Sequence, residues 1–184
     1  MRAVRLLFAL CALAALPPAQ AAWAGPQANE DAVKAAFLPK FMRYIAFPAG
    51  VQPEIGQPFY LCVIGRDPFG QALDRAAASE VVDGHPIAVR RFTNAEAPAV
   101  AGCHAAYVAG ANEQQTTQML AAFARQPTLT ITDNRWGKPR GMIHFAVVAA
   151  RVRFHIDDAA AAERGIGISS RLLALAVEVK QRTL

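Results

Sequence analysis

The chain has 184 residues, of which 54% are hydrophobic, and its 19 Lys and Arg against 14 Asp and Glu give a formal net charge of +5. This length and apolar content predict one globular domain with a sizeable core. The excess of positive charge is mild, and no basic run with interleaved aromatics occurs, which argues against a nucleic-acid-binding protein.

The first 24 residues are typical of a secretory signal peptide. Arg2 and Arg5 precede the apolar run from Leu6 to Leu16, which is too short to span a bilayer. Small residues then mark cleavage near Ala21 or Ala24. We therefore expect residues 1–24 to be removed and residues 25–184 to form the exported domain. Without Arg2 and Arg5, 17 basic residues face 14 acidic ones, a net charge of +3.

Helical and strand patterns alternate along the mature chain. Residues 30–47 predict a helix that Asn29 caps and Pro39 kinks or splits. Asp67, as N-cap, and Pro68, at the first helical position, predict a second helix over residues 69–78. A third helix is expected over 113–125, and strands are expected over 59–64, 87–92, 103–108 and 129–132.

A β-hairpin is predicted from Gly141 to Asp157, and a closing helix from Ile168 to about Gln181. If the turn is Ala149-Ala150, one face of the hairpin is apolar and the other pairs His144 with His155 and carries two arginines. Ala-Ala is a poor sequence for such a turn, and a longer loop would break the histidine pair. The apolar pairs are Ile143 with Ile156, Phe145 with Phe154, and Val147 with Val152. Together these elements predict a single α/β domain, with a mixed β-sheet flanked by helices, a C-terminal β-hairpin and a closing helix.

Two cysteines, Cys62 and Cys103, remain after the signal peptide, at or within predicted strands. An even number in an exported chain favours a disulfide, and a reduced pair in the core is the alternative. Two isolated cysteines lack the spacing of metal ligands.

The motifs of catalysis and cofactor binding are incomplete. Gly65-x-x-x-x-Gly70 has the glycine spacing of a phosphate loop but lacks the lysine that follows it. Ser169 and Ser170 lie in no nucleophile elbow, and a helix N-cap is the better interpretation. A metal shared by His144 and His155 would need further ligands. We expect no enzyme, no cofactor and no metal site.

Several segments together resemble the YfiR family of exported regulatory proteins, in the expected order over nearly all of the mature chain. The strongest block is Gly141-Met142-Ile143, Val152-Arg153-Phe154 and the run Ile168-Ser169-Ser170-Arg171-Leu172-Leu173-Ala174-Leu175-Ala176. The other matching segments are residues 33–38, 61–70, 84–90, 103–104 and 129–133. Phe47 stands where we expect a tryptophan, and Asp157 lies near where we expect an asparagine.

The resemblance implies a periplasmic repressor. Such a protein binds the periplasmic sensor region of an inner-membrane diguanylate cyclase, lowers cyclic di-GMP and reduces biofilm formation. It also implies a homodimer, possible sequestration by an outer-membrane lipoprotein, and tuning by disulfides. This chain has no cysteine pair in the hairpin, so such tuning would rest on Cys62 and Cys103.

The basic side chains near the hairpin and the last helix are the candidate contact face for a partner or ligand. These residues are Arg151, Arg153, His155 and Arg171, with Ser169, Ser170, Lys40 and Arg43 as further candidates. The alternative function is that of a periplasmic small-molecule-binding protein that captures a carboxylate in a basic pocket, aided by free N–H groups at the helix start.

Overall fold

The computed structural model describes residues 25–96 and 100–182, except for the side chain of Pro26, so the predicted signal peptide lies outside the described residues. The strands of the main sheet are β2 (Phe59–Gly65), β3 (Val81–Val82), β4 (His85–Phe92), β5 (Ala105–Ala109), β6 (Leu129–Asp133), β7 (Ile143–Val148), β8 (Arg151–Asp157) and β10 (Val179–Lys180). A small second sheet pairs β1 (Ile45–Ala46) with β9 (Gly167–Ile168). The helices are α1 (Pro26–Phe41), α2 (Gln71–Ala78), α4 (Glu113–Ala122), α5 (Asp158–Ala162) and α6 (Ser170–Leu173), with 3-10 turns η1 (Met42–Tyr44), η2 (Ala49–Val51) and η3 (Asn134–Trp136).

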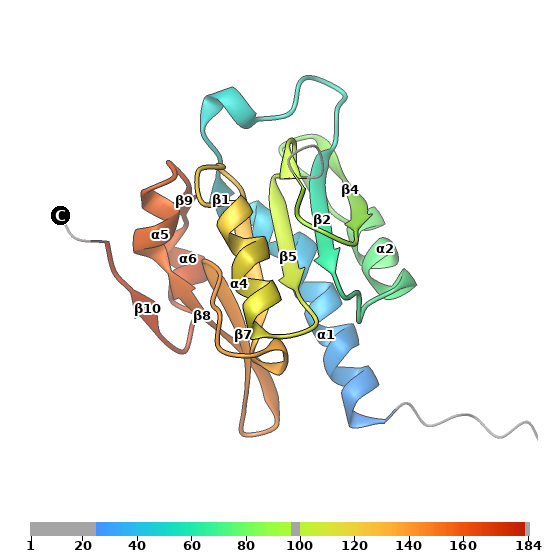
Figure 1. Cartoon of the computed structure of the whole chain (residues 1–184). Helices are drawn as coiled ribbons and strands as arrows, with labels where there is room; N and C mark the ends of the chain where they lie inside the picture. The colour runs from blue at the N-terminus through green and yellow to red at the C-terminus, as the bar shows by residue number, and fades with distance from the viewer. Residues whose placement is uncertain (1–24, 97–99, 183–184) are drawn as a thin grey trace, which may run out of the picture.

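The strands of the main sheet are ordered β10-β8-β7-β6-β5-β2-β4-β3 (Figure 1). Neighbours from β4 to β7 run parallel, β8 returns antiparallel to β7, and β10 lies parallel to the outer edge of β8. The central strands β2 and β5 are buried along most of their length, as expected for parallel strands that are covered on both faces. The fold is thus the predicted mixed α/β domain.

Helices cover the two faces of the sheet unequally. On one face, Phe37 and Phe41 of α1 pack against Phe145 and Phe154, with ring centroids 5.2 to 6.4 Å apart. On the other face, α4 covers only part of the sheet (Figure 1), and its Met119 joins a smaller cluster. On the α4 side of the hairpin, Arg151 and Arg153 of β8 are exposed, whereas His144 and Ala146 of β7 are buried.

The predicted register of the hairpin is confirmed at every pair, from Ile143 opposite Ile156 to Val148 opposite Arg151. The turn is Ala149-Ala150, with φ of +48° and +58°. Both values lie in the left-handed region that favours Gly or Asn, so the cross-strand pairs outweigh the local preference of the turn.

The predicted start of two helices is wrong. The first helix begins at Pro26 with Gly25 as N-cap, not at Glu30 with Asn29 as N-cap, because proline fits the first helical turn. It continues through Pro39 and ends two residues later. The second helix begins at Gln71 rather than Phe69, because Asp67 accepts hydrogen bonds from the N–H groups of Phe69 and Gly70 and so closes a turn that precedes it.

The predicted closing helix is present, but its predicted extent over 168–181 is wrong. Helix α6 ends at Leu173, and the chain then lies along β8, where Val177 N–H donates to the carbonyl of Phe154 and Ile156 N–H donates to that of Glu178. Without this segment β8 would be an open edge strand, with unpaired backbone groups. The last segment therefore covers the edge of β8 instead of extending the helix.

Candidate functional site

A disulfide joins Cys62 of β2 to Cys103, just before β5, with the two Cα atoms 5.9 Å apart. The parallel pairing of β2 with β5 brings the two residues together across the sheet. Both side chains are buried in the small cluster beneath α4, with Cys62 fully inaccessible. The sequence-based prediction of a disulfide is confirmed.

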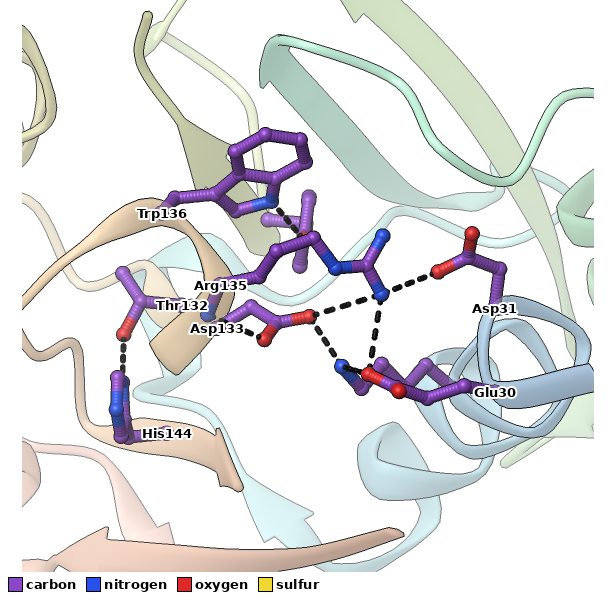
Figure 2. A network of polar contacts seen from close by, with 9 residues as sticks. Glu30, Asp31, Thr132, Asp133, Arg135, Trp136 and His144 are labelled. Carbon is purple, nitrogen blue, oxygen red and sulfur yellow. Dashed lines mark hydrogen bonds and ion pairs between the residues drawn. The ribbon is translucent and has the colours of Figure 1, made fainter. Parts of the chain in front are cut away.

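A network of charged side chains joins the start of α1 to the carboxyl end of β6 (Figure 2). The ammonium of Lys34, which is fully buried, donates to Glu30 and, at 2.5 Å, to Asp133. The guanidinium of Arg135 donates to Asp31 at 2.5 Å and to Glu30 at 3.1 Å. Two cations and three carboxylates thus satisfy one another in a largely buried place.

The surroundings of Glu30 and Arg135 favour the charged forms of these two side chains. Burial alone would raise the pKa of Glu30, but hydrogen bonds from Lys34 and Arg135 hold that pKa below its ordinary value. Burial opposes the charge of Arg135, yet Asp31, Asp133 and Glu30 raise its pKa further. Glu30 and Arg135 are thus held in their charged forms, and the network acts as a clamp between α1 and the sheet.

An aromatic pair extends this clamp to the neighbouring strand. The indole N–H of Trp136 in η3 donates to the hydroxyl of Tyr107 at 2.8 Å (Figure 2). Tyr107 is fully buried in β5, and burial raises its pKa. The guanidinium of Arg66 lies over the Trp136 ring, 5.2 Å from its centroid. These contacts fix the turn that follows β6, so Trp136 has a structural role here.

His144, on the polar face of the hairpin, is buried. Its exposed fraction is 4%, and its Nδ1 lies 2.8 Å from the hydroxyl of Thr132 on β6 (Figure 2). Burial, aided by nearby Arg140, lowers the pKa of His144 to about 4. No cluster of three or more metal-ligating side chains occurs in the part of the chain that the structure describes.

We predict that His144 makes the domain less stable in mild acid. Its pKa is about 4 when folded and near 6.5 when unfolded, so the unfolded chain binds more protons between these values. The free energy of unfolding should therefore fall as the pH drops from 6.5 towards 4, by at most about 1.4 kcal/mol per pH unit from this group. Urea unfolding at several pH values measures this slope.

The matched variant H144Q removes this titration and keeps a polar side chain beside Thr132. Its unfolding free energy should depend less steeply on pH than that of the natural chain. Part of the slope should remain, because burial also lowers the pKa of His104. An unchanged slope in H144Q would contradict the assignment. Measurements above pH 4.5 avoid protonation of Glu30, whose lowered pKa places its contribution in a more acidic range.

The predicted contact residues divide between two faces of the domain. Arg153 and His155 alternate with Phe154 on β8 and therefore lie on the face opposite α1. Lys40 and Arg43 lie on the α1 side, beside Phe154 and Leu172 of α6. The structure therefore does not form one surface from all eight predicted residues.

The remaining candidates lie at the start of α6 and the tip of the hairpin. The hydroxyl of Ser169 accepts from the N–H of Arg171 and caps α6, as predicted from the sequence, while Ser170 is the first residue of that helix. Arg171 is exposed. Arg151, at the tip, lines a hollow beside α1.

A second hollow, of about 290 Å³, lies beside the outer strands and is lined by side chains of both charges. Its basic residues include Arg140, Lys180 and His155. Nδ1 of His155 lies 3.3 Å from a carboxylate oxygen of Glu178 without the geometry of a hydrogen bond, so this buried nitrogen has no hydrogen-bond partner among the described residues. The place suits a small polar ligand.

Sequence reasoning missed Lys34, Asp133 and Arg135. The spacing of Glu30 and Lys34, four residues apart on one helix, is a signal for an ion pair. Asp133 and Arg135, however, follow about 100 residues later, and only the fold brings them to α1.

The disulfide, the buried clamp and the surface hollows define a disulfide-containing α/β domain whose surfaces suit binding. Among the helices of the described residues, none has the length and apolar character needed to cross a membrane. A search of curated proteins finds no match to the chain. A family model described as YfiR/HmsC-like matches residues 31–177, so the chain belongs to the YfiR/HmsC-like family.

The match confirms the resemblance seen in the sequence. The family consists of periplasmic regulators of diguanylate cyclase activity, and it is regulatory rather than catalytic. The matched range begins at Asp31 in α1 and ends at Val177. It therefore includes both cysteines and the hairpin but not β10.

Proposed function

We propose that the chain is an exported protein that binds the periplasmic sensor region of an inner-membrane diguanylate cyclase and represses the enzyme. The family match over residues 31–177 carries this proposal. The physical mechanism is linkage: the repressor binds the inactive conformation of the sensor region more tightly and so shifts its population. Cyclic di-GMP and biofilm formation fall as a consequence.

Further features support export. A disulfide such as Cys62–Cys103 persists in an oxidising compartment like the periplasm. The signal peptide predicted over residues 1–24 would deliver the chain there. A homodimer, capture by an outer-membrane lipoprotein and tuning through the disulfide belong to the same proposal.

Deletion of the gene in its native host is expected to raise cellular cyclic di-GMP, and restoring the gene should lower it again. The rise requires one particular cyclase, because repression is stoichiometric and specific. Inactivating, one at a time, the diguanylate cyclases that have periplasmic sensor regions should therefore abolish the rise in a single case. Measurement of cyclic di-GMP by mass spectrometry tests this. A deletion without effect under several growth conditions would contradict the proposal.

The hollow around His155 favours a second candidate, capture of a small carboxylate. Arg140 supplies positive charge and the unpartnered nitrogen of His155 a polar contact, while Lys180 is bound by Asp157 and Glu178 also lines the hollow. A ligand at 100 times its dissociation constant stabilises the folded state by about 2.7 kcal/mol. A thermal-shift screen of amino acids and small organic acids distinguishes this function, and a screen without any shift contradicts it.

A further inference from the structure

An apolar surface with two adjacent hollows, called the groove below, runs along α1. At the start of the helix, Val33 and Phe37 face Val147 and Val152 of the hairpin across a hollow of about 490 Å³. Towards the end of the helix, Phe37 also lines a second hollow, whose apolar lining is completed by residues of α1, η1, β8 and the α6 region. These are Phe41, Tyr44, Phe154, Leu172 and Leu175. Phe37 lines both hollows, so they lie next to each other along α1.

Several apolar side chains of the groove are exposed to solvent. Val33 is 37% exposed, Val147 41% and Leu175 57%. The stretch from Val33 to Tyr44 is roughly 18 Å long, enough to contact about three turns of a helix. The walls are a helix and a hairpin whose backbones are already hydrogen-bonded. A partner would therefore contact side chains of the groove rather than pair with a strand edge. This geometry suits an amphipathic helix.

The rim of the groove is basic. Lys40 and Arg43 border one hollow, where Arg43 pairs with Glu80 at 3.3 Å, and Arg151 borders the other. Glu30 is the acidic residue at the rim, and Lys34 and Arg135 already bind its carboxylate. Lys40 and Arg151 are exposed and form no ion pair among the described residues. A partner with acidic side chains beside an apolar stripe would therefore complement the groove.

The charge of the rim disfavours a second copy of this chain as occupant. In a symmetric dimer built on this groove, the basic rim of one protomer would meet the same basic rim of the other. An acidic partner gains attraction where a second copy meets repulsion.

We propose that this groove docks an acidic amphipathic helix from the periplasmic sensor region of the cyclase, an inference that rests on the proposed function. The apolar floor supplies the affinity and the basic rim supplies orientation and specificity. Arg153 and His155, on the opposite face, take no part in this docking.

Two exposed variants test the groove in the deletion strain. L175D places a charge on the apolar floor, and K40E combined with R151E reverses the rim. We expect each to weaken binding about 30-fold or more, and so to leave cyclic di-GMP near the level of the deletion strain. Matched controls are I55D, in a fully exposed loop position, and R125E, at an exposed position beyond α4; both should repress like the natural chain.

The outcomes distinguish a failure of the proposed docking groove from a failure of the proposed function. Repression by the natural chain, with equal repression by both groove variants, would overturn the groove and leave the function standing. Failure of the natural chain to repress would overturn the function itself. Periplasmic protein levels and thermal unfolding of the purified variants show whether a loss of repression reflects misfolding. If the groove variants convert a dimeric natural chain to monomers on size-exclusion chromatography, the occupant is a second copy and the proposal is wrong.

Discussion

Replacing Asp133 by alanine is expected to lower the free energy of unfolding by about 3–5 kcal/mol. Lys34 is completely buried, and Asp133 is the partner that joins it to the sheet. Without that carboxylate, the ammonium keeps only Glu30, which it shares with Arg135. A buried charge that has lost a partner costs far more than an exposed one. Urea unfolding followed by circular dichroism measures the change.

A double variant separates the ion pair from the loss of side-chain volume. K34M with D133N removes both charges, keeps similar volumes and leaves Arg135 between Glu30 and Asp31. We expect this double variant to be more stable than D133A, because no uncompensated ammonium remains in the core. A cost below about 1 kcal/mol for D133A would show that Lys34 finds water or another partner.

Removal of the disulfide is expected to cost about 2–5 kcal/mol of unfolding free energy. The bridge closes a loop between residues 41 apart in sequence, and both sulfur atoms lie among apolar side chains. For a domain of this size each kcal/mol shifts the melting temperature by about 2–4 °C. The variant with both C62A and C103A should therefore melt roughly 10 °C lower, which differential scanning calorimetry measures.

Reduction of the natural chain provides the control. Dithiothreitol should lower the melting temperature of the natural chain towards that of the double variant. The same reductant should leave the double variant unchanged, since it has no disulfide. Equal melting temperatures of the natural chain and the double variant would contradict a stabilising role for the bridge.

The hairpin was predictable because the residues that set its register lie close together in the sequence. Aromatic and β-branched residues alternate on both strands, and only one register pairs Phe145 with Phe154. The two alanines of the turn argued for a longer loop, but both adopt the left-handed conformation and every predicted pair forms. Here the tertiary contacts override the local preference.

The last segment was mispredicted because two structures fit the same apolar pattern. Leu172 lies in α6 and is buried, as predicted, whereas Val179 lies in β10. Only the open edge of β8 decides between helix and strand, and that edge exists only in the assembled sheet.

The site was the least predictable part, because its contacts are distant in sequence. His144 is buried beside Thr132, which lies on a neighbouring parallel strand. Glu30 and Asp31, near the start of α1, bind Arg135, which follows about 100 residues later. A pattern along one element reveals which face is polar, but not which remote charge it meets.

The most direct test of the account is the compartment in which the chain represses cyclic di-GMP. The deletion strain should be complemented with the full chain or with a chain that lacks residues 2–24, and cyclic di-GMP measured at matched protein levels. We predict that only the full chain restores the low level, because the sensor region lies in the periplasm. Equal repression by the chain without residues 2–24 would contradict a periplasmic regulator.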